Sequence, residues 1–131
     1  MDVESLVPKD KFDIVNIERI QNLKPEDIST ISFRLLEWLA DINWPVAQAL
    51  VKVLPKFHKE LLPDIRHILS DEINDSEWKW QILEYLVNQF PKESITLLKD
   101  SLLRISMIQA EKDSDEEYLK KTAAEILENL T

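Results

Sequence analysis

Apolar residues recur at steps of three and four along nearly the whole chain, which is the spacing of one buried helix face. The same spacing predicts about seven helices, over residues of about 14–23, 25–42, 45–54, 57–69, 78–90, 91–108 and 115–130. No stretch alternates apolar and polar residues for long enough to predict a strand. A few short buried strands, such as Leu50 to Leu54, are the alternative. The pattern therefore predicts an all-α fold.

Prolines and short polar side chains set the expected helix boundaries. Asp13 is expected to cap the first helix, and Pro25 and Pro45 are expected at the first position of theirs. Pro63 falls inside a predicted helix and is expected to kink it. The segment Ser114–Glu117 has the form of a capping box, which predicts the start of the last helix.

The chain contains an internal repeat. A shift of 33 residues superimposes Pro45, Ala49, Leu50, Val53, Leu54 and Phe57 on Trp78, Ile82, Leu83, Leu86, Val87 and Phe90. A four-residue cassette, Asp-x-x-Trp, occurs at residues 41–44 and 75–78, with a degenerate copy that ends in tyrosine at 115–118. Because one helix pair cannot bury its apolar face alone, this period predicts pairs that stack side by side around one core.

Parts of the chain resemble known helical repeats. Pro63 inside a helix, Asp75 at a turn and an aromatic residue followed by Lys79 resemble a HEAT-type repeat. More narrowly, four segments resemble a small bacterial family known as domain of unknown function 5071: Pro8-Lys9-Asp10-Lys11, Leu36-Glu37-Trp38-Leu39, Asp41-Ile42-Asn43-Trp44-Pro45-Val46-Ala47 and Trp78-Lys79-Trp80-Gln81-Ile82-Leu83. This resemblance spans nearly the whole chain. It implies a HEAT-like helical fold and supplies no activity, cofactor or catalytic residue. Together with the repeat and the length of the chain, it leads us to expect one domain over residues 1–131, built as a short HEAT-like right-handed stack of antiparallel helix pairs.

The chain of 131 residues has no glycine and no cysteine. It therefore has no Walker loop, dinucleotide-binding fingerprint or nucleophile elbow, because each needs a residue that can adopt positive φ or let the backbone approach a ligand. Its length suits a single domain that folds without disulfides or metal ions. The composition thus excludes several common enzyme chemistries, and we expect no cofactor.

Acidic residues outnumber basic ones, 25 to 16, and the net charge at pH 7 is −9. This excess disfavours nucleic acid as a partner, since phosphate contacts need clustered lysine and arginine. Residues 31–110 are nearly balanced, and the charge is concentrated toward the two ends of the chain. An acidic surface keeps a small protein in solution, and it also suits a basic protein partner.

Membrane association and export are not expected. No apolar run approaches the roughly 18 residues that a bilayer span needs. Residues 1–6 are acidic where an export signal is basic and then strongly apolar, so the expected location is the cytoplasm. The lack of cysteine fits that reducing compartment. We expect a monomer or a weak oligomer.

Residues suited to metal binding or nucleophilic catalysis are few. His58 and His67 lie nine residues apart on one predicted helix, so they point to opposite sides and cannot share a metal ion. Glu72, Asp75 and Glu77 lack the glycine and the spacing of a calcium-binding loop. Nothing local in the sequence supplies a serine with both a base and an oxyanion donor. We therefore assign no metal site and no catalytic residue.

Four tryptophans are the strongest candidates for a role beyond packing. Trp44 is expected in the core, because Pro45 fixes its helix entry and apolar residues follow. Trp78 and Trp80 lie about 200° apart around one helix, so at most one of them can face the core squarely. Trp80 is expected to be the one that is partly exposed. Exposed tryptophan is a common hot-spot residue in interfaces. The candidate contacts for a partner are Asp41, Asn43, Trp44, Trp78, Lys79 and Trp80.

These observations together predict a non-catalytic protein-interaction module of the bacterial cytoplasm. The sequence does not identify its partner, and neutralisation of a basic protein such as a toxin is compatible with the acidity and the small size. The alternative is an enzyme that acts on a nucleic acid or a small molecule from a HEAT-like scaffold. For a nucleic acid, such an enzyme needs a basic concave face, and the acidic balance argues against one.

Overall fold

The computed structural model describes residues 2–131, and over that range the chain is helical and contains no strand. The α-helices are α1 (Ile17–Gln21), α2 (Pro25–Glu37), α3 (Pro45–Val53), α4 (His58–Ile68), α5 (Ser76–Tyr85), α6 (Lys92–Thr96), α7 (Lys99–Ser106) and α8 (Asp115–Glu128). Short 3-10 helices are η1 (Val3–Leu6), η2 (Trp38–Ala40), η3 (Leu54–Phe57) and η4 (Val87–Gln89). The prediction of an all-α fold is confirmed.

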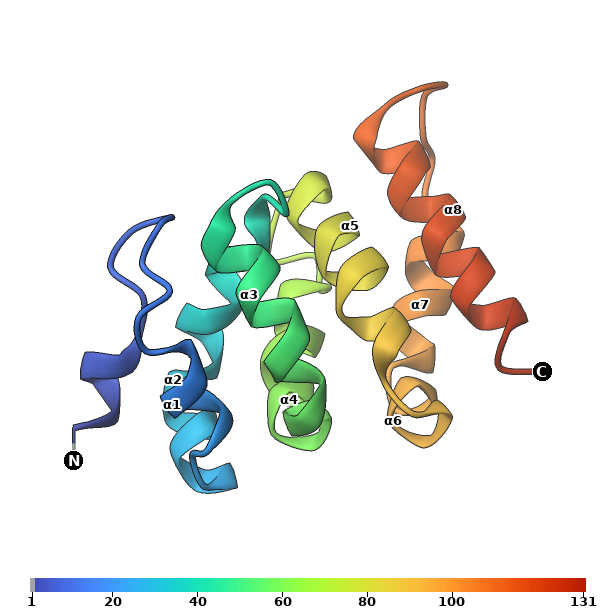
Figure 1. Ribbon diagram of the computed structural model, residues 1–131. Coiled ribbons are helices and arrows are strands. Elements are labelled where there is room, and N and C mark those ends of the chain that lie inside the picture. Colours follow the sequence, from blue (N-terminus) through green and yellow to red (C-terminus); the bar gives the residue numbers. More distant parts are fainter. Residues whose placement is uncertain (1) are drawn as a thin grey trace.

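The helices follow one another across the molecule, and the two termini lie at opposite ends (Figure 1). Helix α1 packs on α3, α2 on α4, and α8 on both α5 and α7. Helices α5 and α8 both begin at the upper edge in Figure 1, and a hydrogen bond of 3.3 Å from Ser76 Oγ to Glu116 Oε1 joins their first turns. The two helices therefore lie side by side with their N-termini together.

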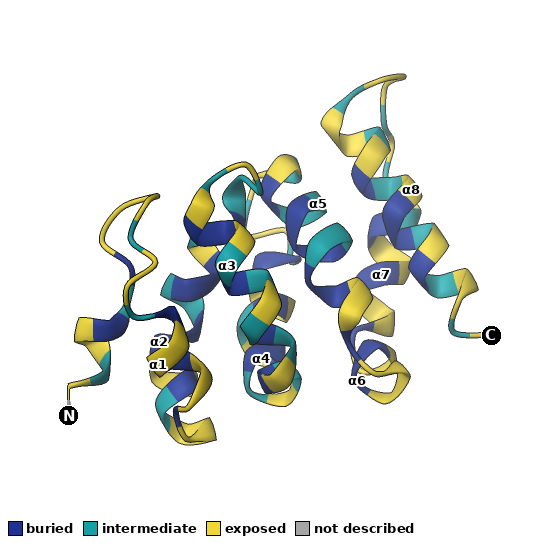
Figure 2. Cartoon of the chain, in the orientation of Figure 1, coloured by how far each residue is buried: buried dark blue, intermediate teal, exposed yellow. Residues whose placement is uncertain are grey.

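One apolar core runs through the whole molecule, and the buried helix faces turn inward toward it (Figure 2). Every α-helix and every 3-10 segment contributes to the core, which extends from Leu6 to Ile126. Ile28, Leu50 and Ile82 are among its fully buried members. Burial of one such side chain contributes about 1.5–3 kcal/mol. The predicted apolar stripes are the main source of this core.

Side chains from neighbouring segments complete several helix C-termini. The last carbonyl groups of a helix have no partner within the helix, and glycine caps are the usual solution. In this glycine-free chain, side-chain nitrogens from residues 31–42 positions away donate to backbone carbonyls near the ends of α1, α2, α3, α4 and α6, at 2.8–3.0 Å. The pairs, donor first, are Lys56 and Gln21, Trp78 and Leu36, Gln89 and Val51, Arg104 and Leu69, and Arg66 and Leu97. These bonds both cap helices and join segments that are distant in sequence.

The boundaries set by proline and by the capping box are confirmed. Pro25 and Pro45 are the first residues of α2 and α3. At the start of α8, Ser114 Oγ accepts the Glu117 N–H at 3.1 Å. Glu117 Oε1 accepts the N–H of Asp113 at 3.2 Å instead of that of Ser114, so the box is shifted by one residue on that side. Asp113 has φ of 64° and is the one residue with positive φ between positions 2 and 131.

The first helix is shorter than the predicted 14–23. The Asp13 carboxylate accepts the Lys9 N–H at 2.9 Å and closes the preceding loop, so it does not cap a helix. Helix α1 begins after Asn16, and Ile14 lies at the surface with 52% exposure. The prediction was wrong for Asp13 and Ile14 because the loop uses the carboxylate that the helix start would need.

Three other helices differ in extent from their predictions. The predicted 78–90 helix begins two residues earlier and ends at Tyr85, after which the chain tightens into η4. The predicted 25–42 helix ends at Glu37, and the chain tightens into η2. The predicted 91–108 helix is divided into α6 and α7 at Leu97 and Leu98. Here Arg66 Nη2 donates to the Leu97 carbonyl at 3.0 Å, so a side chain from another helix takes a group that a continuous helix would use. Helix α4 continues through Pro63, whose predicted kink stays a prediction.

None of the helices formed by residues 2–131 combines the length and the apolar character that crossing a bilayer requires.

Candidate functional site

The six candidate contact residues occupy two neighbouring places in the fold. Asp41, Asn43 and Trp44 belong to the turn between η2 and α3, and residues 78–80 belong to the first two turns of α5. The Ile42 N–H donates to Gln81 Oε1 at 3.2 Å and ties this turn to α5. The side chains nevertheless point in different directions and do not form one surface.

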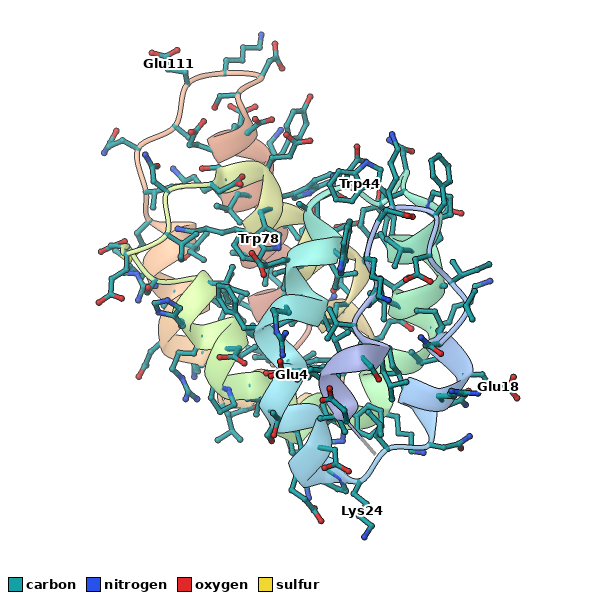
Figure 3. The ribbon with its side chains drawn as sticks, turned by 90° about the vertical axis from the view of Figure 1, so that its left-hand side faces the viewer. Glu4, Glu18, Lys24, Trp44, Trp78 and Glu111 are labelled. Atoms are coloured by element: carbon teal, nitrogen blue, oxygen red, sulfur yellow. The ribbon has the colours of Figure 1, made fainter. Side chains whose placement is uncertain are left out.

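Trp78 is a buried packing residue. It is 9% exposed, and its indole N–H donates to the Leu36 carbonyl at 2.9 Å. The Phe33 ring meets it nearly edge to face, with ring centroids 5.9 Å apart. In Figure 3 it lies among the helices, whereas Trp44 lies at the edge of the molecule. Trp78 therefore helps to hold α5 on α2 and offers little surface to a partner.

Lys79 is directed to the turn after α4. Its Nζ donates to the Ser70 carbonyl at 3.0 Å. Burial lowers the pKa of the Lys79 ammonium below its ordinary value, the Asp71 carboxylate raises it in opposition, Arg104 lowers it further and Asp75 raises it. This side chain is committed to an internal contact and is a poor candidate for partner binding.

Trp44 lies at the edge of the core and not within it. It is only partly buried, and its ring meets Trp38 at a centroid distance of 5.9 Å and an angle of 72°. Its backbone is extended because Pro45 takes the first position of α3 and leaves Trp44 outside the helix. The prediction of a core position was wrong for Trp44. The adjoining Asp41 carboxylate accepts the Asn43 N–H at 2.9 Å and shapes the turn.

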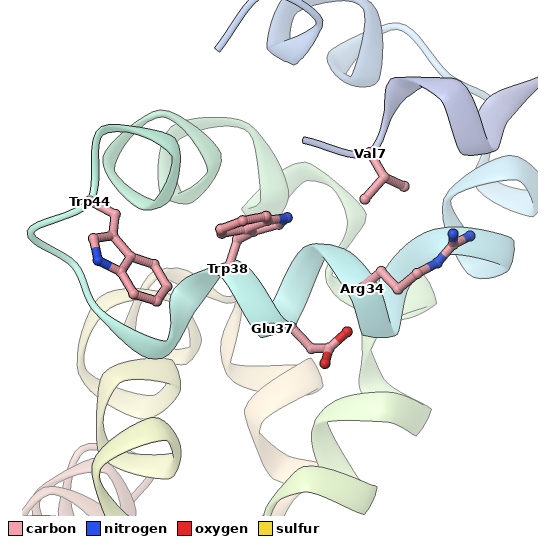
Figure 4. Close-up of a pocket in the computed structure, with 5 residues that line it drawn as sticks. All are labelled: Val7, Arg34, Glu37, Trp38 and Trp44. Carbon is pink, nitrogen blue, oxygen red and sulfur yellow. The ribbon is translucent and has the colours of Figure 1, made fainter. Parts of the chain in front are cut away.

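A shallow pocket of about 370 Å³, here named the α2–α3 pocket, lies beside this tryptophan pair (Figure 4). It is lined by Val7, Arg34, Glu37, Trp38 and Trp44. The Trp38 indole N–H donates to the Pro8 carbonyl at 3.1 Å, and Arg34 forms an ion pair of 2.8 Å with Glu4. The N-terminal segment thus closes one side of the pocket. Among residues 2–131, the Trp44 indole N–H finds no hydrogen-bond acceptor.

Trp80 lines a second pocket, of about 220 Å³, between the first turns of α5 and α8. This α5–α8 pocket is lined by Glu77, Trp80, Asp115 and Tyr118. Trp80 is partly exposed, as predicted, and Tyr118 is 49% exposed. Sequence reasoning did not name Asp115 and Tyr118 as site residues, although the degenerate third cassette at 115–118 marked their position. The pocket forms because α5 and α8 start side by side.

The α5–α8 pocket has an acidic rim. The first turn of α8 carries Asp115, Glu116 and Glu117, and that of α5 carries Glu77. Lys121 lies 3.6 Å from Glu117 and compensates one of these charges. The arrangement places carboxylates beside two aromatic rings, a combination that suits a cationic group.

The histidines and serines form polar links within the fold. His58 Nδ1 lies 2.5 Å from Ser94 Oγ, and this pair from α4 and α6 was not predicted. Ser94 is only 2% exposed, so a substrate does not reach its hydroxyl. On the other side of α4, His67 Nδ1 lies 3.4 Å from Glu72. The two histidines thus face different neighbours.

A cluster of three or more histidine, cysteine, aspartate or glutamate side chains that could hold a metal ion is absent from the part of the chain that the structure describes. Every buried side-chain nitrogen or oxygen within residues 2–131 has a hydrogen-bond partner. Ser32, for example, donates to the Asp64 carboxylate. The buried polar groups are thus accounted for by contacts within the fold.

An exposed apolar loop was not anticipated from the sequence. Phe12, Ile14 and Val15 are 67%, 52% and 82% exposed. The loop is held to the fold through the Lys11 carbonyl, which accepts the Val46 N–H at 3.0 Å. Of these three residues, Ile14 was predicted to start the buried face of the 14–23 helix, and Phe12 and Val15 were assigned no role.

Comparison with known families agrees with the resemblance seen in the sequence. The family described as Domain of unknown function (DUF5071) matches residues 6–127, which is nearly the whole chain. The chain therefore belongs to this family. No curated protein matches the chain.

Proposed function

We propose that this chain is a non-catalytic protein-interaction module of the bacterial cytoplasm that binds a basic protein. The observation that carries the proposal is the α5–α8 pocket, where the Trp80 and Tyr118 rings stand beside the Glu77 and Asp115 carboxylates. Aromatic residues anchor protein interfaces because they bury a large area at low entropic cost. The carboxylates select a positively charged partner.

The charge of the whole chain supports the same partner class. The net charge of −9 attracts a basic protein over a distance comparable with the Debye length, about 8 Å at physiological salt. It repels nucleic acid and anionic lipid surfaces by the same effect. Neutralisation of a basic protein such as a toxin is one function that such a binder would serve.

We include in this proposal a scaffold that is a short right-handed HEAT-like stack of antiparallel helix pairs. Its support is the packing of α1 on α3, α2 on α4 and α5 on α8, together with the repeat of 33 residues in the sequence. In such a stack each pair contacts mainly its neighbours, and equivalent helices of successive pairs start at the same edge. The first turns of α5 and α8, whose residues line the α5–α8 pocket, lie at the upper edge in Figure 1.

Site-specific photo-crosslinking in the host cell tests the function. A benzoylphenylalanine in place of Tyr118 places the probe in the pocket, and one in place of the exposed Leu97 is the matched control. Leu97 is 60% exposed and directly follows α6, the helix that lies at the lower edge of the molecule in Figure 1. The expected result is one discrete adduct, specific to the Tyr118 probe, whose crosslinked peptide is rich in lysine and arginine.

Three results would contradict the proposed function. The first is no protein adduct from the Tyr118 probe. The second is the same set of adducts from both probes. The third is an adduct formed only with a second copy of this chain, which would make the pocket a self-association surface.

A further inference from the structure

The Trp80 ring is held in place by its neighbours and still presents surface to solvent. Its indole N–H donates to Thr122 Oγ1 at 3.0 Å. Tyr85 meets the ring at a centroid distance of 5.8 Å and 76°, and Tyr118 at 6.5 Å and 51°. Because the N–H is already bonded, the exposed part of Trp80 offers ring carbon alone. A ring fixed in this way binds a guest with little ordering of its own.

The carboxylates decide whether that guest is apolar or cationic. Within residues 2–131, neither Glu77 nor Asp115 forms an ion pair. The N-termini of α5 and α8 each contribute a partial positive charge of roughly one half, which is smaller than the charge of the carboxylates in the two first turns. An apolar guest would desolvate these carboxylates without a partner, whereas a cation would be stabilised by them.

The size of the pocket limits the guest to one side chain. Its volume of about 220 Å³ is smaller than the roughly 300–1,000 Å³ of a typical small-molecule site. Two carboxylates from different helices and one aromatic face suit a planar cation with several donors. Arginine meets this need better than lysine, because guanidinium stacks on aromatic rings, is weakly hydrated and donates in several directions.

We propose that the α5–α8 pocket binds one arginine side chain of the basic partner. The guanidinium stacks on Trp80 and donates to Glu77 and Asp115, while Tyr118 covers its stem. This inference rests on the proposed function and names the group of the partner that the pocket receives. It also makes the pocket the point at which the complex is anchored, since a buried arginine against an aromatic ring is a typical interface hot spot.

Titration with single amino-acid derivatives tests the inference without the partner. N-acetyl-arginine amide, the lysine derivative and the uncharged citrulline derivative are added at constant ionic strength, and indole N–H resonances are followed by NMR. Citrulline has nearly the shape of arginine and lacks its charge. We expect a saturating shift of the Trp80 resonance with arginine, a weaker one with lysine and none with citrulline, while the Trp38 resonance stays in place.

Two double variants separate the pocket from general acidity. Glu77→Gln with Asp115→Asn removes the rim carboxylates. Glu93→Gln with Asp100→Asn removes the same charges from the first turns of α6 and α7, where both side chains are exposed. The rim variant should weaken arginine binding about fivefold, as expected for the loss of two exposed ion pairs, and the control should leave it unchanged.

Equal shifts with arginine and citrulline would overturn the inference, as would equal weakening in the two double variants. The crosslinking experiment tests the proposed function independently of the titration and of the double variants. If the Tyr118 probe captures a basic protein and the pocket does not distinguish arginine from citrulline, the inference is wrong and the proposed function survives. If the probe captures no protein, the proposed function is wrong whatever the titration shows.

Discussion

The two Asp-x-x-Trp cassettes have the same spacing and opposite structures. In the second, Asp75 Oδ1 accepts the Trp78 N–H at 3.0 Å and caps α5, so Trp78 is the third helical residue and its ring is buried. In the first, the Asp41 carboxylate accepts the Asn43 N–H, and α3 begins only at Pro45. Trp44 therefore precedes its helix and lies at the surface edge of the core.

The difference between the cassettes comes from one residue. Proline lacks an N–H and forces the residue before it out of the helical region, so Pro45 fixes the helix start directly after the tryptophan. Lys79, which follows the second cassette as Pro45 follows the first, permits the helix to begin three residues earlier relative to the tryptophan. A shift of three residues rotates a side chain by about 300° around the helix axis. A repeated motif thus predicts a repeated turn only when its neighbours also agree.

The largest effect should come from Trp78→Ala. Removal of a buried indole leaves a cavity and takes one donor from the Leu36 carbonyl, so we expect a loss of about 3–5 kcal/mol in the free energy of unfolding. Urea denaturation followed by circular dichroism measures it. A loss below about 1 kcal/mol would show that the second cassette is not a core element.

Trp44→Ala should cost less, about 1–2 kcal/mol, because the ring is partly exposed and loses mainly its contact with Trp38. Urea melts under the same conditions compare the two variants directly. A loss as large as that of Trp78→Ala would return Trp44 to the core and remove the contrast between the cassettes.

The two aspartates should differ by a smaller amount. Asp75→Ala removes a helix cap and should cost about 1 kcal/mol. Asp41→Ala removes a turn contact at the surface and should cost less than about 0.5 kcal/mol. Thermal melts of the two single variants give the difference. The reverse order would mean that the carboxylate of the first cassette also caps a helix.

The smallest effect concerns Lys79 and pH. Burial lowers the pKa of Lys79 in the folded protein below the ordinary lysine pKa of about 10.4. Between these two pKa values, Lys79 is protonated to a greater extent in the unfolded state than in the folded state. The contribution of Lys79 to the free energy of unfolding therefore increases as the pH rises across that range. The difference in unfolding free energy between Lys79→Met and the parent protein should shift in favour of the parent from pH 7 to pH 10. A difference that is constant or moves the other way would contradict this.

The fold was largely predictable because its helix starts depend on neighbours in sequence. Pro25, Pro45 and Ser114 act within one turn, and each begins a helix where expected. The division of the predicted 91–108 helix was not predictable, because it depends on Arg66, which lies 31 residues away. The position of Ile14 was missed because a carboxylate that suits a helix cap also suits a loop.

The candidate site was predictable only in part. The partial exposure of Trp80 followed from its angle to Trp78 on one helix. Its partners Asp115 and Tyr118 lie on another helix about 35 residues later, and only packing brings them together. Lys79 was proposed as a contact, and its bond to the Ser70 carbonyl depends on a turn whose shape the sequence does not specify.

The side-chain caps of the helix ends have a consequence for the denatured ensemble. Glycine is the residue that loses most backbone entropy on folding, by roughly 0.5–1 kcal/mol relative to alanine. A chain of average composition and this length would contain about nine glycines. By ending its helices with distant donors and placing Asp113 at its one positive φ between residues 2 and 131, this chain avoids that loss. A stabilisation on the order of several kcal/mol therefore resides in the restricted freedom of the unfolded chain, where no contact of the folded protein reveals it.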